Sequence, residues 1–170
     1  GTGKSYTINK MMEEMYPDQT ARDAHYRRLI FHPTYTHEDF VGSIKPLVTP
    51  DRPLDYVFAP GPLTLLLKDA FEHPAEVFYL VIEEINRGNC AQIFGDLFQL
   101  LDRDGINESK YSIDPDADLG KFIAEKLEGY DVPDLIKRGM KLKLPSNLYI
   151  WATMNTSDQS LFPIDSAFKR

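Results

Sequence analysis

The chain of 170 residues is 42% hydrophobic and 12% aromatic, enough for the core of about one domain, which excludes wholesale disorder. Its net charge of −7 argues against strong nucleic-acid binding by bulk electrostatics, since surfaces that bind phosphate are usually basic. The lone cysteine, Cys90, excludes an internal disulfide, and no apolar run approaches the ~20 residues of a membrane span, so we expect a cytoplasmic protein with no membrane partner.

The chain opens on half of a phosphate-binding loop. The run Gly1-Thr2-Gly3-Lys4-Ser5 matches the second half of G-x-x-x-x-G-K-[ST], a pattern whose backbone N–H groups point at phosphates. In that pattern Lys4 neutralises the β/γ-phosphates and the Ser5 hydroxyl coordinates Mg²⁺. A match this short also arises by chance, so it needs support elsewhere in the chain. Because the first glycine of the pattern and the strand before it are missing, we expect a fragment of a longer polypeptide.

Several elements are expected between this loop and the middle of the chain. Apolar periodicity predicts a helix over residues 6–15 and a second helix over 63–71. Between them, residues 27–32 are predicted to form a strand. His32 ends the strand, a position where histidine is more often structural than catalytic. The proline-rich residues 33–62 are expected to be loop, apart from a short helical piece near 37–44.

The most informative stretch runs from residue 77 to residue 87. Six apolar residues predict a strand buried on both faces, which is typical of parallel sheets. Glu83 and Glu84 follow directly, and ligands of open α/β sheets bind outside the carboxyl ends of the strands. Because the metal needs an acid opposite the loop hydroxyl, this strand makes the short loop match a strong signal for a P-loop nucleotidase.

The second half of the chain offers one more candidate. Asn89 is expected to cap a helix over 90–101. The charged residues 103–146 are predicted to be an insertion or an elaborated segment between core elements, with helices near 119–127 and 133–138. A second buried strand over 148–154 ends at Asn155, a position used to place water at a γ-phosphate. An ordinary turn rich in Asn, Thr, Ser and Asp is the alternative interpretation.

Together these residues resemble the AAA+ nucleotidases, and most closely the McrB branch, the GTP-using motor of methylcytosine-dependent restriction. Walker A, Walker B and sensor 1 correspond to residues 1–5, residues 81–84 and Asn155. Three runs are more specific, because they match that branch's FHPSYSYEDF-like, DEINRAN and MNTADRS sequences, at residues 31–41, 83–89 and 154–160. The resemblance covers most of the chain outside about 103–146.

The resemblance implies a fold and a set of elements. The expected fold is α/β, a P-loop NTPase with three αβα layers and a parallel sheet in the order 5-1-4-3-2. Its first and last strands and its lid domain lie outside this sequence, so the chain is a partial AAA+ domain over residues 1–170. An open slot beside strand 4 of that order predicts that the chain alone is unstable or prone to aggregation.

The resemblance also implies roles for individual residues. Glu84 is the expected catalytic base and Asn155 helps to place the attacking water, while Ser5 and Glu83 hold Mg²⁺. Arg170 corresponds to an arginine finger that reaches a neighbouring subunit; a solvated arginine at a helix end is the alternative. Arg87 either faces a neighbour or makes a local salt bridge. This logic requires a homo-oligomeric ring, taken as a hexamer.

Two departures separate this chain from the family pattern: Glu83 stands where an aspartate is usual, and Gln159 replaces an arginine. The expected function is Mg²⁺-dependent hydrolysis of ATP or GTP that drives DNA translocation, with an McrC-like nuclease partner and DNA held by other domains or the ring pore. A MoxR-like or dynein-related remodelling ATPase, and a scaffold that binds nucleotide without hydrolysing it, are the alternatives.

Overall fold

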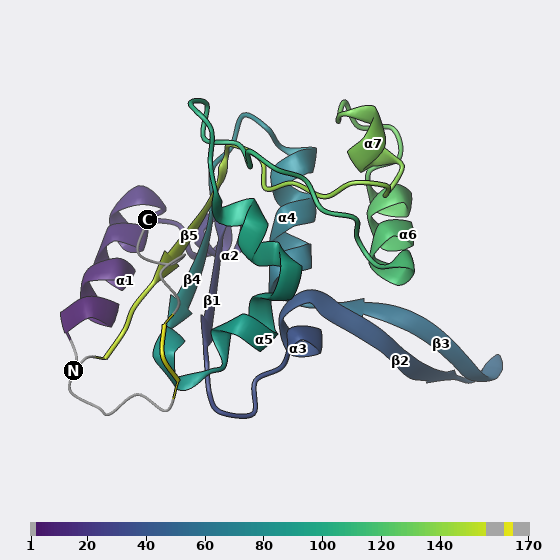
Figure 1. Ribbon diagram of the computed structural model, residues 1–170, viewed down its shortest axis with the longest axis horizontal. Helices are drawn as coiled ribbons and strands as arrows, with labels where there is room; N and C mark the ends of the chain where they lie inside the picture. The colour runs from purple at the N-terminus through teal and green to yellow at the C-terminus, as the bar shows by residue number, and fades with distance from the viewer. Residues whose placement is uncertain (1–2, 156–161, 165–170) are drawn as a thin grey trace.

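The computed structural model describes residues 3–155 and 162–164, which form a parallel sheet with helices on both faces (Figure 1). The sheet contains β1 (Tyr26–Ile30), β4 (Phe78–Glu83) and β5 (Leu148–Ala152) in the order β1-β4-β5, and both pairings are parallel. This arrangement confirms the predicted α/β class with its parallel sheet, and it places the two strands predicted to be buried side by side. The prediction of a second buried strand is only partly right, because in β5 only Leu148 is buried while Tyr149 and Ala152 are exposed.

Strand β4 lies in the middle because its side chains are apolar on both faces. Leu80, Val81 and Ile82 are fully buried. One face packs against α4 (Pro62–Glu72) and α5 (Cys90–Phe94), and the opposite face carries Tyr79, whose hydroxyl donates to the sulfur of Met15 at the end of α1 (Gly3–Met15). Figure 1 shows α1 on one side of the sheet and α4 with α5 on the other.

The helix predicted after the loop is confirmed as α1, which begins at Gly3 at the carboxyl edge of the sheet. A shorter helix, α2 (Gln19–His25), leads into β1, and the Asp18 carboxylate caps it by accepting from the Ala21 N–H at 2.8 Å. The predicted helix over 63–71 is confirmed as α4, whose apolar face is buried as expected.

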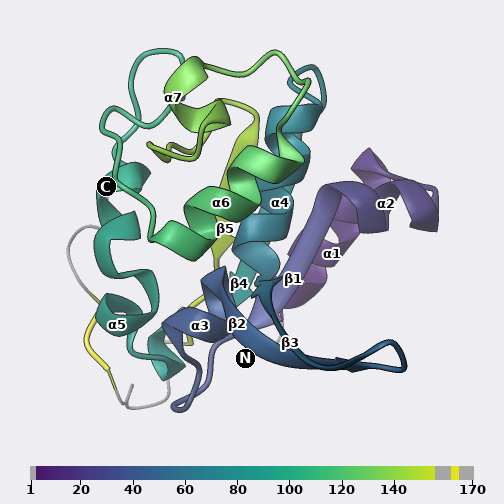
Figure 2. The same cartoon turned by 90° about the vertical axis from the view of Figure 1, so that its right-hand side faces the viewer.

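The loop predicted for residues 33–62 is wrong over most of its length. After α3 (His37–Val41), the chain forms an antiparallel hairpin of β2 (Gly42–Thr49) and β3 (Arg52–Pro60), which projects from the body of the molecule (Figures 1 and 2). Gly42 ends the helix with a φ of 122°, a conformation that favours glycine. Prolines are tolerated because each strand of a two-stranded ribbon has a free edge, so Pro46 pairs with Tyr56 inside the hairpin.

The continuous helix predicted over 90–101 is also wrong. α5 ends at Phe94, and a 3₁₀ helix, η2 (Gly95–Leu101), continues from Gly95, whose φ of 52° breaks the α-helical path. The apolar stripe nevertheless reaches the core, since Ile93, Leu97 and Leu100 are buried. A further 3₁₀ helix, η1 (Ile85–Arg87), follows β4 directly.

The charged segment 103–146 contains two helices, α6 (Ala117–Lys126) and α7 (Asp134–Lys137), close to those predicted. Its two ends are tied together by Arg103, whose guanidinium donates to the carbonyls of Asn107, Pro145 and Leu148 at 2.9, 3.0 and 2.8 Å. Whether the segment is an insertion into the core stays a prediction. Within residues 3–155 and 162–164, no helix combines the length and apolar character needed to cross a membrane.

Candidate functional site

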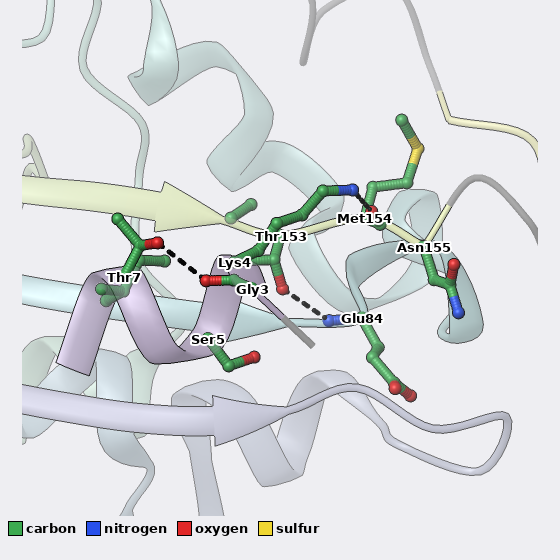
Figure 3. A pocket seen from close by; sticks show the side chains of 10 residues that line it. Gly3, Lys4, Ser5, Thr7, Glu84, Thr153, Met154 and Asn155 are labelled. Atoms are coloured by element: carbon green, nitrogen blue, oxygen red, sulfur yellow. Dashed lines mark hydrogen bonds between the residues drawn. The ribbon is translucent and has the colours of Figure 1, made fainter. Parts of the chain in front are cut away.

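A cavity of about 750 Å³ lies where α1 begins and where β4 and β5 end (Figure 3). It is lined by Gly3, Lys4, Ser5, Thr7, Ile8, Glu84, Ala152, Thr153, Met154 and Asn155. Three segments far apart in the sequence therefore meet here: the phosphate-loop residues, the end of the central strand and the end of the next strand. The expectation that Lys4, Ser5, Glu84 and Asn155 lie together agrees with this geometry.

The first turn of α1 presents a positive end to the cavity. Backbone N–H groups at a helix N-terminus attract anions, and α1 has 13 residues whose peptide dipoles add. The Lys4 ammonium lies across the cavity, where it donates to the Met154 carbonyl at 2.7 Å (Figure 3). An anionic phosphate competes well for this ammonium, because a charge-assisted hydrogen bond is stronger than one to a neutral carbonyl.

Glu83 is buried beside the cavity and forms a bidentate ion pair with Arg28. The Arg28 Nε and Nη2 atoms lie 2.9 Å from the two carboxylate oxygens, and the Glu83 side chain is only 8% exposed. The bond from Arg28 holds the pKa of the Glu83 carboxyl below its usual range, although burial acts in the opposite direction, and a hydrogen bond with Ser5 lowers the pKa further. Glu83 is therefore an ionised acid next to the loop hydroxyl.

These oxygens fit a magnesium ion. Mg²⁺ prefers hard oxygen ligands and in nucleotide sites is bound by one or two protein groups together with phosphate and water. The Ser5 hydroxyl lies near enough to the Glu83 carboxylate to lower its pKa, which places both oxygens on the side of the site where one ion would bind. Among the residues described, no cluster of three or more His, Cys, Asp or Glu side chains suits a metal bound by protein alone.

Glu84 leaves the strand in an unusual backbone conformation. Its φ of 52° and ψ of 44° are left-handed, which is rare for a residue with a side chain and is found mostly where function requires it. The turn places the Glu84 side chain on the cavity while Glu83 stays buried, and Figure 3 shows it beyond the end of β4. Its carboxylate accepts from Arg87 Nη1 at 2.7 Å, so Arg87 makes the local salt bridge that was one of the two expectations.

The segment that carries Asn155 is fixed to the end of β4. The Thr153 N–H donates to the Ile82 carbonyl at 2.8 Å, and the Thr153 carbonyl accepts from the Ile85 N–H at 2.9 Å. Asn86, which is 3% exposed, donates through Nδ2 to the Asn155 carbonyl at 2.9 Å. These bonds continue the β4–β5 pairing beyond both strands. They therefore fix the backbone that carries Asn155 relative to the backbone that carries Glu84.

Sequence reasoning missed Arg28 and Asn86. Arg28 lies on β1, and its ion pair follows from the register of β1 against β4, which periodicity alone does not give. Asn86 could have been predicted from the sequence, because it is a polar residue that closely follows a buried strand and its two acids. Its buried Oδ1 atom has no hydrogen-bond partner in the described part of the chain.

Some predicted residues lie elsewhere. Gly1, Thr2, Gln159 and Arg170 fall outside the described residues, so their predicted roles are not addressed by the geometry. His32 lies outside the residues that line the cavity, with Nδ1 3.1 Å from the Thr34 hydroxyl and its ring against Tyr35, which agrees with a structural role.

Comparison with protein families gives a match over residues 1–170 to the AAA domain, dynein-related subfamily. The chain belongs to this family. The predicted AAA+ ATPase module is thereby confirmed, with nucleotide as its substrate. The subfamily name alone does not separate a restriction motor from the dynein-related alternative.

Two curated relatives support the McrB branch. The chain is 35% identical over 194 residues to the type II restriction enzyme BsuMI component YdiS of Bacillus subtilis (strain 168), covering all of this chain and 52% of that protein. It is 24% identical over 172 residues to the type IV methyl-directed restriction enzyme EcoKMcrB subunit of Escherichia coli (strain K12), covering all of this chain and 32% of that protein. The chain thus spans about half, or less, of the relatives that it matches.

Proposed function

We propose that this AAA domain hydrolyses a nucleoside triphosphate with Mg²⁺ and powers a modification-dependent restriction system. The observation that carries the proposal is the meeting of Lys4, Ser5, Glu84 and Asn155 around one cavity at the start of α1. Such an arrangement supplies a cation and a helix N-terminus for the phosphates, and an acid and an amide for the attacking water, as phosphoryl transfer to water requires.

Each group has a part in the proposed reaction. The α1 N-terminus and Lys4 hold the phosphates, while Ser5 and Glu83 hold Mg²⁺, which when bound neutralises charge on the β- and γ-phosphate oxygens. Glu84 orients the attacking water and accepts its proton, and the Asn155 amide fixes the water's second hydrogen bond. Arg87, already 2.7 Å from Glu84, holds that carboxylate in one orientation.

The remaining parts come from a neighbouring subunit. We assign Arg170 as the arginine finger of a ring-shaped homo-oligomer, a hexamer, in which it stabilises transition-state charge at the adjacent site. An McrC-like nuclease is the proposed partner, because both relatives are named as parts of restriction enzymes. With a net charge of −7 on this chain, DNA contacts are assigned to other domains or to the ring pore. The proposed location is the cytoplasm, where such substrate DNA lies.

Phosphate release by the full-length protein, with ATP and with GTP and with and without DNA, tests this function. A preference for GTP and stimulation by modified DNA support a restriction motor of the McrB branch. A preference for ATP with no response to DNA favours the remodelling ATPase instead. Tight nucleotide binding without phosphate release identifies a scaffold and contradicts the proposed hydrolysis.

A further inference from the structure

Arg28 and Glu83 come together through the register of two neighbouring strands. Arg28 pairs with Val81 and Ile30 pairs with Glu83 in the parallel ladder of β1 and β4. Residues two apart on a strand share a face, so Arg28 points to the same side of the sheet as Glu83. α1 covers that side, as shown by the hydrogen bond from the Tyr26 hydroxyl to Asn9. The guanidinium then reaches along the strand direction to the carboxylate.

The ion pair fixes both oxygens of the acid. Two parallel N–H···O bonds of 2.9 Å hold a carboxylate in one plane and one orientation. This matters for a glutamate, because its side chain has one more rotatable bond than aspartate and loses more freedom when it is held in place. Because the Arg28–Glu83 ion pair already holds the Glu83 side chain, the side chain is ordered before any metal binds.

The ion pair with Arg28 leaves lone pairs of the Glu83 carboxylate free for a metal ion. A carboxylate has about four lone-pair positions, and the two bonds from Arg28 occupy only two of them. Ser5, in the first turn of α1, lies near enough to Glu83 to lower the pKa of its carboxyl, so a further lone-pair position remains on that side. Arg28 therefore fixes the acid from the β1 side and leaves its opposite side open toward Ser5.

We propose that Arg28 is a positioning residue that holds the Glu83 carboxylate against Ser5 and so allows a glutamate to act as the magnesium-linked acid. The inference rests on the proposed function. Arg28 acts through Glu83 and needs no contact with nucleotide. Loss of a group that orients a metal-linked carboxylate typically weakens metal affinity by about 10- to 100-fold.

Arg27 provides a matched control on the same strand. Its side chain points to the opposite face, where Nη2 lies 3.6 Å from the Asp69 carboxylate of α4. The two arginines have similar exposure, 34% and 39% of the side chain, and each pairs with one acid. Arg27→Met is thus the same side-chain replacement as Arg28→Met, made on the same strand at a residue that does not line the cavity.

The test is a magnesium titration of nucleotide binding by the full-length protein, followed with fluorescent analogues of ATP and GTP. We expect Arg28→Met to raise the Mg²⁺ concentration for half-maximal binding by about 10- to 100-fold, with Arg27→Met close to wild type. Binding of the analogue without Mg²⁺ should be unchanged in both variants, which a general loss of structure does not produce. Arg28→Lys keeps the charge but cannot form two parallel hydrogen bonds to the carboxylate. Its Mg²⁺ concentration for half-maximal binding should therefore lie between those of wild type and Arg28→Met.

A second substitution separates positioning from charge. Glu83→Asp shortens the acid, so adding it to Arg28→Met should bring the Mg²⁺ requirement back toward wild type. An effect of charge alone predicts no such recovery. If Arg28→Met does not fold, the same comparison is made between Arg28→Lys and Arg28→Lys/Glu83→Asp.

Two results overturn the inference. One is an equal Mg²⁺ requirement in Arg28→Met and Arg27→Met, and the other is a lower requirement in Arg28→Met than in wild type. A wild-type protein that binds nucleotide with no Mg²⁺ dependence contradicts the proposed function itself, so the two failures are distinguishable.

Discussion

The carboxyl edge of the sheet and the β2–β3 hairpin are built on opposite principles. At the edge, strand β4 is fixed by its buried side chains, β5 is held by its pairing with β4 and by the buried Leu148, and polar residues follow each strand where it ends. In the outer part of the hairpin, large apolar side chains such as Val48, Leu54 and Tyr56 are 72%, 58% and 62% exposed, and backbone pairing holds the two strands together there. Nearer the body of the molecule, Phe58 packs against Phe122 of α6. The candidate catalytic residues therefore lie where packing fixes the backbone, and none of the described residues of the hairpin lines the cavity.

The largest expected effect on stability is at the sheet. Ile82 is fully buried in β4, immediately before the two acids. Ile82→Ala should lower the free energy of unfolding by about 2–5 kcal/mol, because it removes buried methyl groups and leaves a cavity. Urea unfolding of the full-length protein measures this loss. A cost below about 1 kcal/mol would mean that β4 is not the centre of the core.

Lys4 tests the chemical side of the same edge. Its ammonium donates a hydrogen bond to the Met154 carbonyl, and it is assigned to the phosphates. Lys4→Met should weaken triphosphate binding by about 10- to 100-fold, since a hydrogen bond to a charged group contributes roughly 1.5–3 kcal/mol. Lys10→Met, on the same helix but outside the cavity lining, is the control. Equal affinities for the two variants would remove Lys4 from the site.

The junction between the body and the hairpin should be sensitive at one position. A Cβ at Gly42 would lie 2.6 Å from the Ala59 carbonyl oxygen, and the φ of 122° is unfavourable for alanine. Gly42→Ala should cost more than about 1 kcal/mol of stability. Gly105→Ala, where a Cβ meets nothing within 4 Å, should be close to neutral in the same urea experiment. A neutral Gly42→Ala would show that α3 and β2 need no special turn.

The smallest effect is expected in the hairpin itself. Val48 is 72% exposed, so Val48→Ser should change the free energy of unfolding by no more than about 0.5 kcal/mol. A loss near that of Ile82→Ala, measured in parallel, would show that the hairpin surface is covered in the assembled protein, and the contrast between the two regions would fail.

The sequence allowed much of the sheet edge to be predicted, for physical reasons that particular residues illustrate. The apolar run before Glu83 specifies a strand buried on both faces, and the carboxyl end of such a strand is where ligands bind, so Glu84 was a sound candidate. Asn155 followed from the same reasoning on β5. Lys4 and Ser5 followed from the spacing of the loop that opens α1.

Other features depend on partners that a single strand does not reveal. The Arg28–Glu83 ion pair needs the register of β1 against β4, and the left-handed backbone of Glu84 depends on the Thr153 hydrogen bonds around it. The hairpin was missed because its apolar residues are not buried on one face and its prolines resemble those of a loop. The instability expected for the chain alone stays a prediction.

The central claim is that Glu84 is the base of a nucleotide-hydrolysing site, and a single-turnover assay with the full-length protein tests it most directly. Phosphate release from ATP and GTP is compared between wild type and Glu84→Gln, which keeps the size of the side chain but removes its charge. Loss of about 10² to 10⁴ in the hydrolysis rate, with nucleotide binding retained, is the predicted result. Hydrolysis by Glu84→Gln at the wild-type rate would contradict the account and assign the base to another residue.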